Sequence, residues 1–219
     1  MNEALLSRIG DAVLRGQLPS IENLVREALA ENIPPLQIIQ GGLAKGMAAV
    51  GVRFKAGDYF LPEVMVSAKT MAAAVAILEP LLESGTRIEP LGKFLIGTVS
   101  GDVHDIGKNI VSMMLRGAGF AVSDLGVNVS AERFVEAIRK ERPDIVGMCA
   151  LLSTTMPAQK KTLEAISAAG LRDQVKVMVG GAPVQAKWAE QIGADGYAPD
   201  AVSAVDMAKE LLGLVSGTD

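Results

Sequence analysis

The chain has 219 residues, with 25 acidic and 21 basic side chains, a formal net charge of −4, one cysteine (Cys149) and one histidine (His104). It has no basic cluster, which argues against nucleic acid and against an anionic membrane surface as binding partners. A single cysteine excludes an internal disulfide, and one cysteine with one histidine excludes a zinc site built from several such ligands.

The first part of the chain, to about residue 84, has apolar residues at helical spacing and no strand pattern. We predict four helices: one ending near Leu14, one with Ser20 as its N-cap, one from Pro35 to about residue 54 and one from Leu61 to about residue 82. Four helices with short connections indicate a small bundle. The longest unbroken apolar run, residues 71–78, is too short to span a bilayer, and the amino terminus has no signal-peptide pattern. We therefore expect a soluble cytoplasmic protein.

Residues 84–92 are polar and contain glycine and proline, which is typical of an interdomain linker, so we expect domains at 1–89 and 90–219. In the second domain, strand patterns alternate with helical patterns. The predicted strands are 94–99, 120–125, 144–149, 175–179 and 196–197, and the predicted helices begin near 108, 130, 156 and 200. This alternation predicts an α/β domain with a parallel five-stranded sheet, Rossmann-like and flavodoxin-like, with helices on both faces. Ligands of such sheets bind at the carboxyl ends of the strands.

The loop after the first predicted strand contains the only histidine together with two aspartates and a lysine. From Gly101 to Lys108 it resembles a phosphate-binding P-loop, but five residues instead of four precede the Gly-Lys pair, and no Ser or Thr follows. Two aspartates would also repel a phosphate. A purely structural interpretation is open as well: Asp102 and Asp105 cap the next helix, and His104 packs within the loop.

A metal site remains possible if most ligands come from outside the protein. His104 is two residues from Asp102, so the carboxylate can accept the proton of one imidazole nitrogen while the other nitrogen binds a metal. One imidazole with an orienting carboxylate is sufficient for a metal that a macrocycle already holds.

The chain contains a spaced triple of motifs: Asp102-x-His104-x-x-Gly107, then Cys149-Ala-Leu151 after 41 residues, then Gly180-Gly181 after 28 more. This triple resembles the signature of cobalamin-binding domains. With the helical first part, it is similar to the corrinoid carrier proteins of methylamine and methanol methyltransferase systems and to the cobalamin module of methionine synthase. The segment 57–63 looks like the corresponding segment of their helical cap.

The resemblance implies a cobalamin cofactor, a cobalt corrinoid, bound base-off and His-on. His104 would be the axial ligand of the cobalt in place of the cofactor's own dimethylbenzimidazole. Asp102 would accept its hydrogen bond, and Thr155 would extend this relay, so these three are the implied catalytic residues. The implied cofactor-binding residues are Gly101, Asp102, Val103, His104, Asp105, Ile106, Gly107, Cys149, Leu151, Ser153, Thr155, Gly180 and Gly181. Leu151 and the two glycines would line a slot for the nucleotide tail, where glycine leaves room for a planar group.

One position departs from the family pattern, because Cys149 stands where the family has a serine. A thiol is a weak hydrogen-bond donor, so Ser153 or Thr154 takes over the contact to the tail, or packing alone holds it. Cys149 is then a small buried side chain at the end of a strand. In the helical domain, the candidates to cover the upper face of the corrin, each of which can equally be a core or staple residue, are Met47, Met65, Met71, Tyr59 and Phe60.

The implied function is that of a methyl carrier: cobalt receives a methyl group from a substrate-specific methyltransferase and passes it, as methyl-Co(III), to a second methyltransferase. The protein is then a subunit of a methyltransferase system and not a complete enzyme, and a reductive activase is a further candidate partner. The alternatives are a cobalamin-dependent sensor or regulator, the small subunit of an adenosylcobalamin mutase, and a phosphate-binding or signalling α/β domain. A DNA-binding regulator needs a basic helix, whereas residues 1–90 hold 8 basic and 10 acidic side chains.

Overall fold

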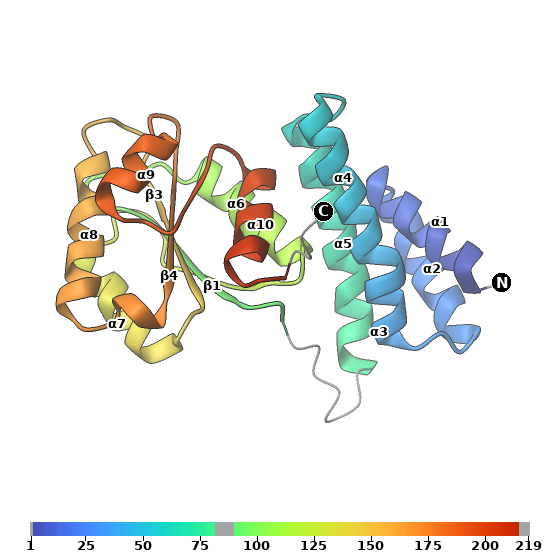
Figure 1. Ribbon diagram of the computed structural model, residues 1–219. Coiled ribbons are helices and arrows are strands. Elements are labelled where there is room, and N and C mark those ends of the chain that lie inside the picture. Colours follow the sequence, from blue (N-terminus) through green and yellow to red (C-terminus); the bar gives the residue numbers. More distant parts are fainter. Residues whose placement is uncertain (1, 82–89, 215–219) are drawn as a thin grey trace. The chain divides into compact units, whose positions relative to one another are not determined.

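The computed structural model describes residues 2–81 and 90–214 of the chain. The chain forms two compact units, residues 1–89 and 90–219, which are described separately (Figure 1). Most of the predicted interdomain linker, residues 84–89, lies outside the described residues.

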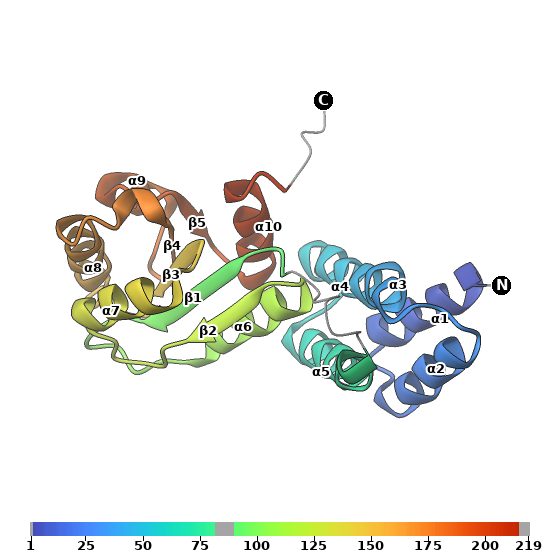
Figure 2. The same ribbon diagram turned by 90° about the horizontal axis from the view of Figure 1, so that it is seen from below.

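The first unit is helical (Figure 2). Its helices are α1 (Asn2–Leu14), α2 (Leu18–Ala30), α3 (Pro35–Ile38), α4 (Ala44–Ala56) and α5 (Leu61–Leu78), with a π-helical turn at Ile39–Leu43 and a 3-10 turn at Glu79–Leu81. The π-helical turn joins α3 to α4 without a break, so the predicted four-helix arrangement is confirmed. The predicted N-cap of the second helix is wrong: Gln17 holds that position, not Ser20. Pro19 lies in the first turn, where a missing N–H has no cost, so the helix begins before the serine.

Helix α5 packs within the bundle against α1, α2 and α4. With its 3-10 extension, the segment Leu61–Leu81 is the one candidate among the described residues that is long and apolar enough to cross a membrane. Side chains of its buried face, such as Val64, Met71 and Leu78, belong to the core of the bundle. A core helix can meet the same criteria of length and composition, and 39% of the apolar stretch is buried here.

The second unit is an α/β domain. Its strands are β1 (Lys93–Thr98), β2 (Ala121–Asp124), β3 (Ile145–Cys149), β4 (Lys176–Gly180) and β5 (Gly196–Ala198). Its helices are α6 (Ile106–Gly117), α7 (Ala131–Glu141), α8 (Met156–Ala168), α9 (Ala186–Ile192) and α10 (Ala201–Leu211), with a 3-10 turn at Arg172–Gln174. The fold prediction is confirmed, except that α9 has no counterpart among the predicted helices.

All strand pairs are parallel, and the strand order is β2-β1-β3-β4-β5. Strands β1, β3, β4 and β5 are largely buried because helices cover both faces of the sheet, whereas the edge strand β2 is mostly exposed. Helices α6 and α10 pack together on one face, whereas α7, α8 and α9 share a core with the other face (Figure 1). Phe134, Leu163 and Ile192 bring these three helices into that core.

The strand order fixes where a ligand can bind. The chain passes from β1 to one side of the sheet to form β2, and then returns to the other side of β1 to form β3. The connections that leave β1 and β3 therefore diverge to opposite faces, and their loops meet at the carboxyl edge between these strands. The register pairs Thr98, the last residue of β1, with Cys149, the last residue of β3.

Candidate functional site

Asp102, in the loop after β1, links this loop to the loop after β3. Its Oδ1 atom lies 2.7 Å from the Nδ1 atom of His104 and accepts a hydrogen bond from the His104 backbone N–H at 3.1 Å. Its Oδ2 atom accepts hydrogen bonds from the Thr155 hydroxyl at 2.7 Å, from the Leu151 N–H at 2.7 Å and from the Leu152 N–H at 3.4 Å. The structure thus brings together the three residues that the sequence assigned to the relay.

The Asp102 side chain is fully buried, which would raise its pKa. The hydrogen bonds that it accepts, first from Thr155 and His104, outweigh burial and hold the pKa of this carboxyl well below its usual range. Asp102 is therefore an anion at neutral pH, and it favours the imidazole tautomer that carries its proton on Nδ1. It does not cap the next helix, contrary to the structural interpretation.

The His104 side chain is 45% exposed, although its partner carboxylate is buried. Its backbone carbonyl accepts a hydrogen bond from the Thr98 hydroxyl at 2.8 Å, which fixes the loop to the end of β1. Because Nδ1 contacts Asp102, the lone pair of the Nε2 atom is the one that could bind a metal ion. His104 is thus suited to be a single metal ligand whose ring orientation is set by Asp102.

The other predicted cofactor-binding residues of this loop lie at the surface; they are Gly101, Val103, Asp105, Ile106 and Gly107. Asp105 occupies the N-cap position of α6, but its carboxylate accepts a hydrogen bond from the Asn109 side chain and makes no cap bond to the backbone. The large apolar side chains Val103 and Ile106 are about 70% exposed. A Cβ atom on Gly107 would meet no protein atom within 4 Å. The loop thus presents apolar surface and open space beside His104.

The predicted tail slot lies at the ends of β3 and β4. Leu151 and Ser153 are exposed, and Gly180 and Gly181 are half-buried. The family resemblance implied that glycine is needed at both positions to leave room for a ligand. At Gly181 the structure gives a different reason. A side chain there would overlap the backbone carbonyl of Ala150, and φ is +124°, so the fold itself requires glycine.

Cys149 is half-buried at the end of β3. Burial raises the pKa of its thiol to about 12, although the Lys108 charge acts in the opposite direction. The thiol is therefore neutral at physiological pH, which suits a packed side chain at a strand end.

The five candidates from the helical domain have different environments. Met47 and Met71 are core residues of the bundle. The Tyr59 hydroxyl donates a hydrogen bond to the Leu14 carbonyl at 2.9 Å, and its ring lies beside the Arg53 guanidinium. These three side chains have structural roles in the helical unit, whereas those of Phe60 and Met65 are exposed.

Two buried polar groups near the site were not found from the sequence. Lys108, in α6, is almost fully buried and forms an ion pair with Asp124, the last residue of β2. Gln159, in α8, donates hydrogen bonds to the Met148 and Gly180 carbonyls at 2.9 and 3.2 Å and so joins β3 to β4 below the tail slot. Both residues could have been suspected from the sequence, because each is a polar residue on the face of a helix that packs against the sheet.

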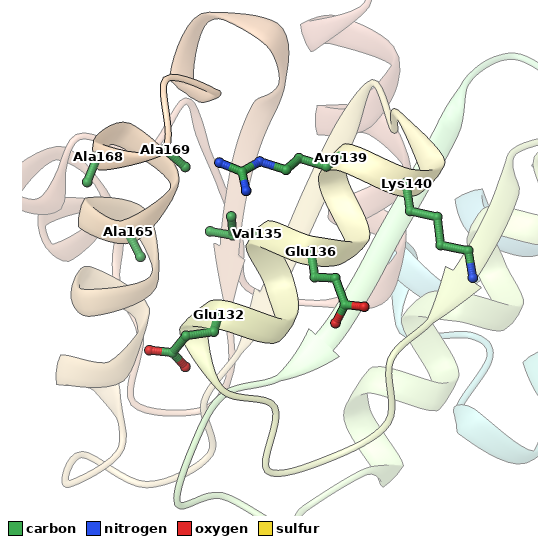
Figure 3. Close-up of a pocket in the computed structure, with 8 residues that line it drawn as sticks. All are labelled: Glu132, Val135, Glu136, Arg139, Lys140, Ala165, Ala168 and Ala169. Atoms are coloured by element: carbon green, nitrogen blue, oxygen red, sulfur yellow. The ribbon is translucent and has the colours of Figure 1, made fainter.

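A groove lies between α7 and α8 (Figure 3). Small apolar side chains, such as Ala165 and Ala168, line it together with charged side chains, such as Glu132 and Arg139. It contains none of the predicted site residues, and neither a histidine nor a cysteine lines it.

The donor set at the carboxyl edge limits which metal it suits. Among the described residues, no group of three His, Cys, Asp or Glu side chains is placed to hold a metal ion. A metal bound through His104 must therefore bring its other ligands with it, as a metal held by a macrocycle does. The exposed apolar side chains beside His104 are also suited to packing against an organic ring system.

Two family models and several known proteins match the chain. Residues 92–206 match the model of the B12 binding domain, and residues 5–79 match a second model described as a B12 binding domain. The chain is 48% identical to the dimethylamine corrinoid protein of Methanosarcina barkeri over 96% of its own length and 98% of that protein. It is 43% identical to a corrinoid protein of Desulfitobacterium hafniense (strain Y51), with coverages of 96% and 98%.

Solved structures show the same similarity. The methanol:cobalamin methyltransferase complex of Methanosarcina barkeri contains a chain that matches with a TM-score of 0.86 and 30% identity, over 97% of this chain and 81% of that one. A cobalamin-binding protein of Desulfitobacterium hafniense DCB-2 matches with a TM-score of 0.79 and 30% identity, over 94% and 98%. The monomethylamine corrinoid protein of Methanosarcina barkeri matches with a TM-score of 0.53 and 39% identity, over 96% and 100%.

Proposed function

The chain belongs to the B12-binding corrinoid proteins, and we propose that it carries a methyl group on cobalamin from a substrate-specific methyltransferase to a second methyltransferase. Cobalamin is its cofactor. When bound, the cofactor supplies a cobalt centre that accepts a methyl group and gives it up again. Because relatives and solved corrinoid proteins are matched over nearly the whole chain, the helical unit included, a carrier is better supported than a regulator or a mutase subunit.

The single observation that carries the proposal is the state of the only histidine. His104 is half exposed, and a buried anionic carboxylate accepts a hydrogen bond from its Nδ1 atom. The Nε2 atom would ligate the cobalt base-off and His-on, in place of the dimethylbenzimidazole. Asp102 and Thr155 would hold the ring in one tautomer and orientation, with Nε2 as the ligating atom.

The same contacts give the protein a way to follow changes in cobalt ligation. If Nε2 ligates the cobalt, the Asp102 carboxylate would accept the hydrogen bond of Nδ1 from the other side of the ring. If Nε2 is released, the same hydrogen bond would keep the half-exposed ring in place. The loop would therefore keep its conformation in both ligation states.

Residues beside the ligand would hold the cofactor. Val103 and Ile106 provide exposed apolar surface against which the corrin can pack. Gly107 leaves space for the close approach of the ring. Leu151, Ser153 and the end of β4 would receive the nucleotide tail, with Cys149 as a packed wall. Residues 1–89 would serve as the cap domain, with Phe60 and Met65 as the exposed candidates to cover the cofactor.

We propose a methylated amine as the methyl donor. The relatives with 48% and 47% identity are dimethylamine corrinoid proteins, whereas the matched chain of the methanol complex is 30% identical. The partners are then an amine-specific methyltransferase, a second methyltransferase on the acceptor side and a reductive activase. All of them would act in the cytoplasm.

The proposal is tested with the visible spectrum of the purified chain after addition of cobalamin. Wild type is expected to give the base-off, His-on spectrum, His104→Ala a spectrum without axial histidine, and Ser100→Ala, an exposed change in the same loop, the wild-type spectrum. Identical spectra for wild type and His104→Ala would overturn the role of His104.

The methyl donor is tested by adding purified methyltransferases for dimethylamine, monomethylamine and methanol with their substrates. Only amine-dependent methylation of the carrier supports the proposed donor.

A further inference from the structure

Asn128 has an uncommon backbone conformation close to the relay. It lies in the loop between β2 and α7, and its φ angle is +51°. Among the described residues, the other non-glycine residues with positive φ are Asn32 and Arg142. Asparagine tolerates this region better than most residues, so the conformation is accessible, but it is not the default.

In this conformation Asn128 binds the backbone on both sides of the Asp102 side chain. Its side-chain oxygen Oδ1 accepts a hydrogen bond from the Gly101 N–H at 2.8 Å. Its backbone N–H donates a hydrogen bond to the Asp102 carbonyl, also at 2.8 Å. One residue of the β2 loop therefore fixes the peptide group between Ser100 and Gly101 and the peptide group that follows the Cα atom of Asp102.

The loop that carries Asn128 is itself fixed to the sheet. The Val129 N–H donates to the Thr98 carbonyl at 2.9 Å, and the Thr98 N–H donates to the Gly126 carbonyl at 3.0 Å. The Gly126 N–H donates to the Asp124 carboxylate at 2.8 Å. Because β2 and β1 hold it in this way, the Asn128 loop is a rigid support rather than a free turn.

We infer that Asn128 is a positioning residue for the proposed axial ligand: it holds the Asp102 backbone so that the carboxylate meets Nδ1 of His104. This inference rests on the proposed function of His104. The Asp102 side chain receives donors from the β3 loop on one oxygen and from His104 on the other. Those contacts are made together only if the backbone of Asp102 stays in place between them, and Asn128 supplies that restraint from the β2 side.

A structural alternative is that asparagine is present only because the turn needs a positive φ. Asn128→Gly separates the two explanations, because glycine adopts a positive φ without strain and keeps the backbone N–H but lacks Oδ1. Asn32→Gly is the matched control, since Asn32 has φ of +57° in the helical unit. Asn128→Asp keeps an accepting oxygen and is the conservative variant.

The single histidine makes a direct measurement possible. In protein labelled with ¹⁵N-histidine, NMR of the chain without cobalamin reports one imidazole and the ratio of its Nδ1–H to its Nε2–H tautomer. We expect Asn128→Gly to lower this ratio about threefold to tenfold, the range for loss of one neutral hydrogen bond, while the chain stays folded. Asn32→Gly is expected to match wild type, and Asn128→Asp to stay within about twofold of it.

The second measurement is the visible spectrum after addition of cobalamin, where the histidine-ligated fraction is expected to fall in Asn128→Gly and not in Asn32→Gly. A wild-type tautomer ratio and wild-type ligation in Asn128→Gly would overturn the inference. Failure of the proposed function is distinguishable, because it shows as equal spectra for wild type and His104→Ala, whereas the tautomer ratio is measured without cobalamin.

Discussion

The backbone of Gly181 passes so close to Ala150 that a Cβ atom at position 181 would lie 1.9 Å from the Ala150 carbonyl oxygen. No side chain can move aside to relieve this overlap, because the obstructing atom belongs to the backbone. We predict that Gly181→Ala lowers the free energy of unfolding by at least about 3 kcal/mol. Denaturant unfolding of the chain without cobalamin measures it.

The control for this change is Gly170→Ala, which also has a positive φ, +71°, but has no neighbour within 4 Å of the added Cβ. It is expected to lose only about 1–2 kcal/mol, the cost of the left-handed conformation. Equal losses in the two variants would contradict the close approach to Ala150.

Gly107 is predicted to respond in the opposite direction. It lies in the first turn of α6, and a Cβ atom there meets no protein atom within 4 Å. Gly107→Ala should therefore leave stability unchanged or raise it by up to about 1 kcal/mol, because alanine favours the helix. If the open space serves the corrin, the same variant binds cobalamin more weakly, which a spectral titration measures. An unchanged affinity of Gly107→Ala for cobalamin would show that Gly107 has no role in binding the cofactor.

Thr155 allows a test of the buried end of the relay. Its hydroxyl donates to the carboxylate of Asp102, so Thr155→Val removes one hydrogen bond to a buried charge and should cost about 1.5–3 kcal/mol of stability. Thr162, which lies in helix α8 and is also buried, donates its hydroxyl hydrogen bond to the Ala158 carbonyl. Thr162→Val should cost about 1 kcal/mol and leave histidine ligation of cobalamin unchanged. Similar effects of both variants on ligation would argue against the relay.

The Cys149 thiol is expected to react slowly. Burial raises its pKa to about 12, above the ordinary value of 9.0, so the neutral form is favoured in the folded chain. Its contribution to stability is complete below about pH 9 and is lost as the pH rises from 9 towards 12, since the unfolded thiol ionises first. Alkylation by iodoacetamide between pH 7 and 9 should remain far slower than that of free cysteine, and should show no titration near pH 8.5. A rate close to that of free cysteine would contradict this environment.

The fold could be predicted from the sequence because the apolar residues of its helices and strands recur with clear helical or strand spacing. The predicted strand 94–99 lies one residue beyond the observed strand Lys93–Thr98. The helix predicted to begin near residue 130 begins at Ala131. Helix α9 was missed because it has only seven residues, too few to show a helical period. The Ser20 cap was wrong because a proline in the first turn moved the start of the helix upstream.

From the residues alone, the site could be predicted only where its geometry is local, whereas the distant contact of Thr155 with Asp102 was implied by the family resemblance. Asp102 and His104 are two residues apart, so their contact follows from the loop itself. The Leu151 N–H meets Asp102 across 49 positions of the chain, and Gly101 meets Asn128 across 27. These contacts depend on the order of the strands and on the backbone conformation of the three loops that follow β1, β2 and β3. No residue pattern encodes them without the tertiary structure.

The pairing of β1 with β3 also sets an order for events during protein synthesis. The carboxylate in the loop after β1 receives its buried hydroxyl donor from a residue 53 positions later. While a ribosome is still making α7, His104 has already been translated, but three of the five donors to the Asp102 carboxylate have not. If His104 ligates the corrinoid as proposed, the cofactor is expected to reach its final coordination only after the third strand has been made and has joined the first.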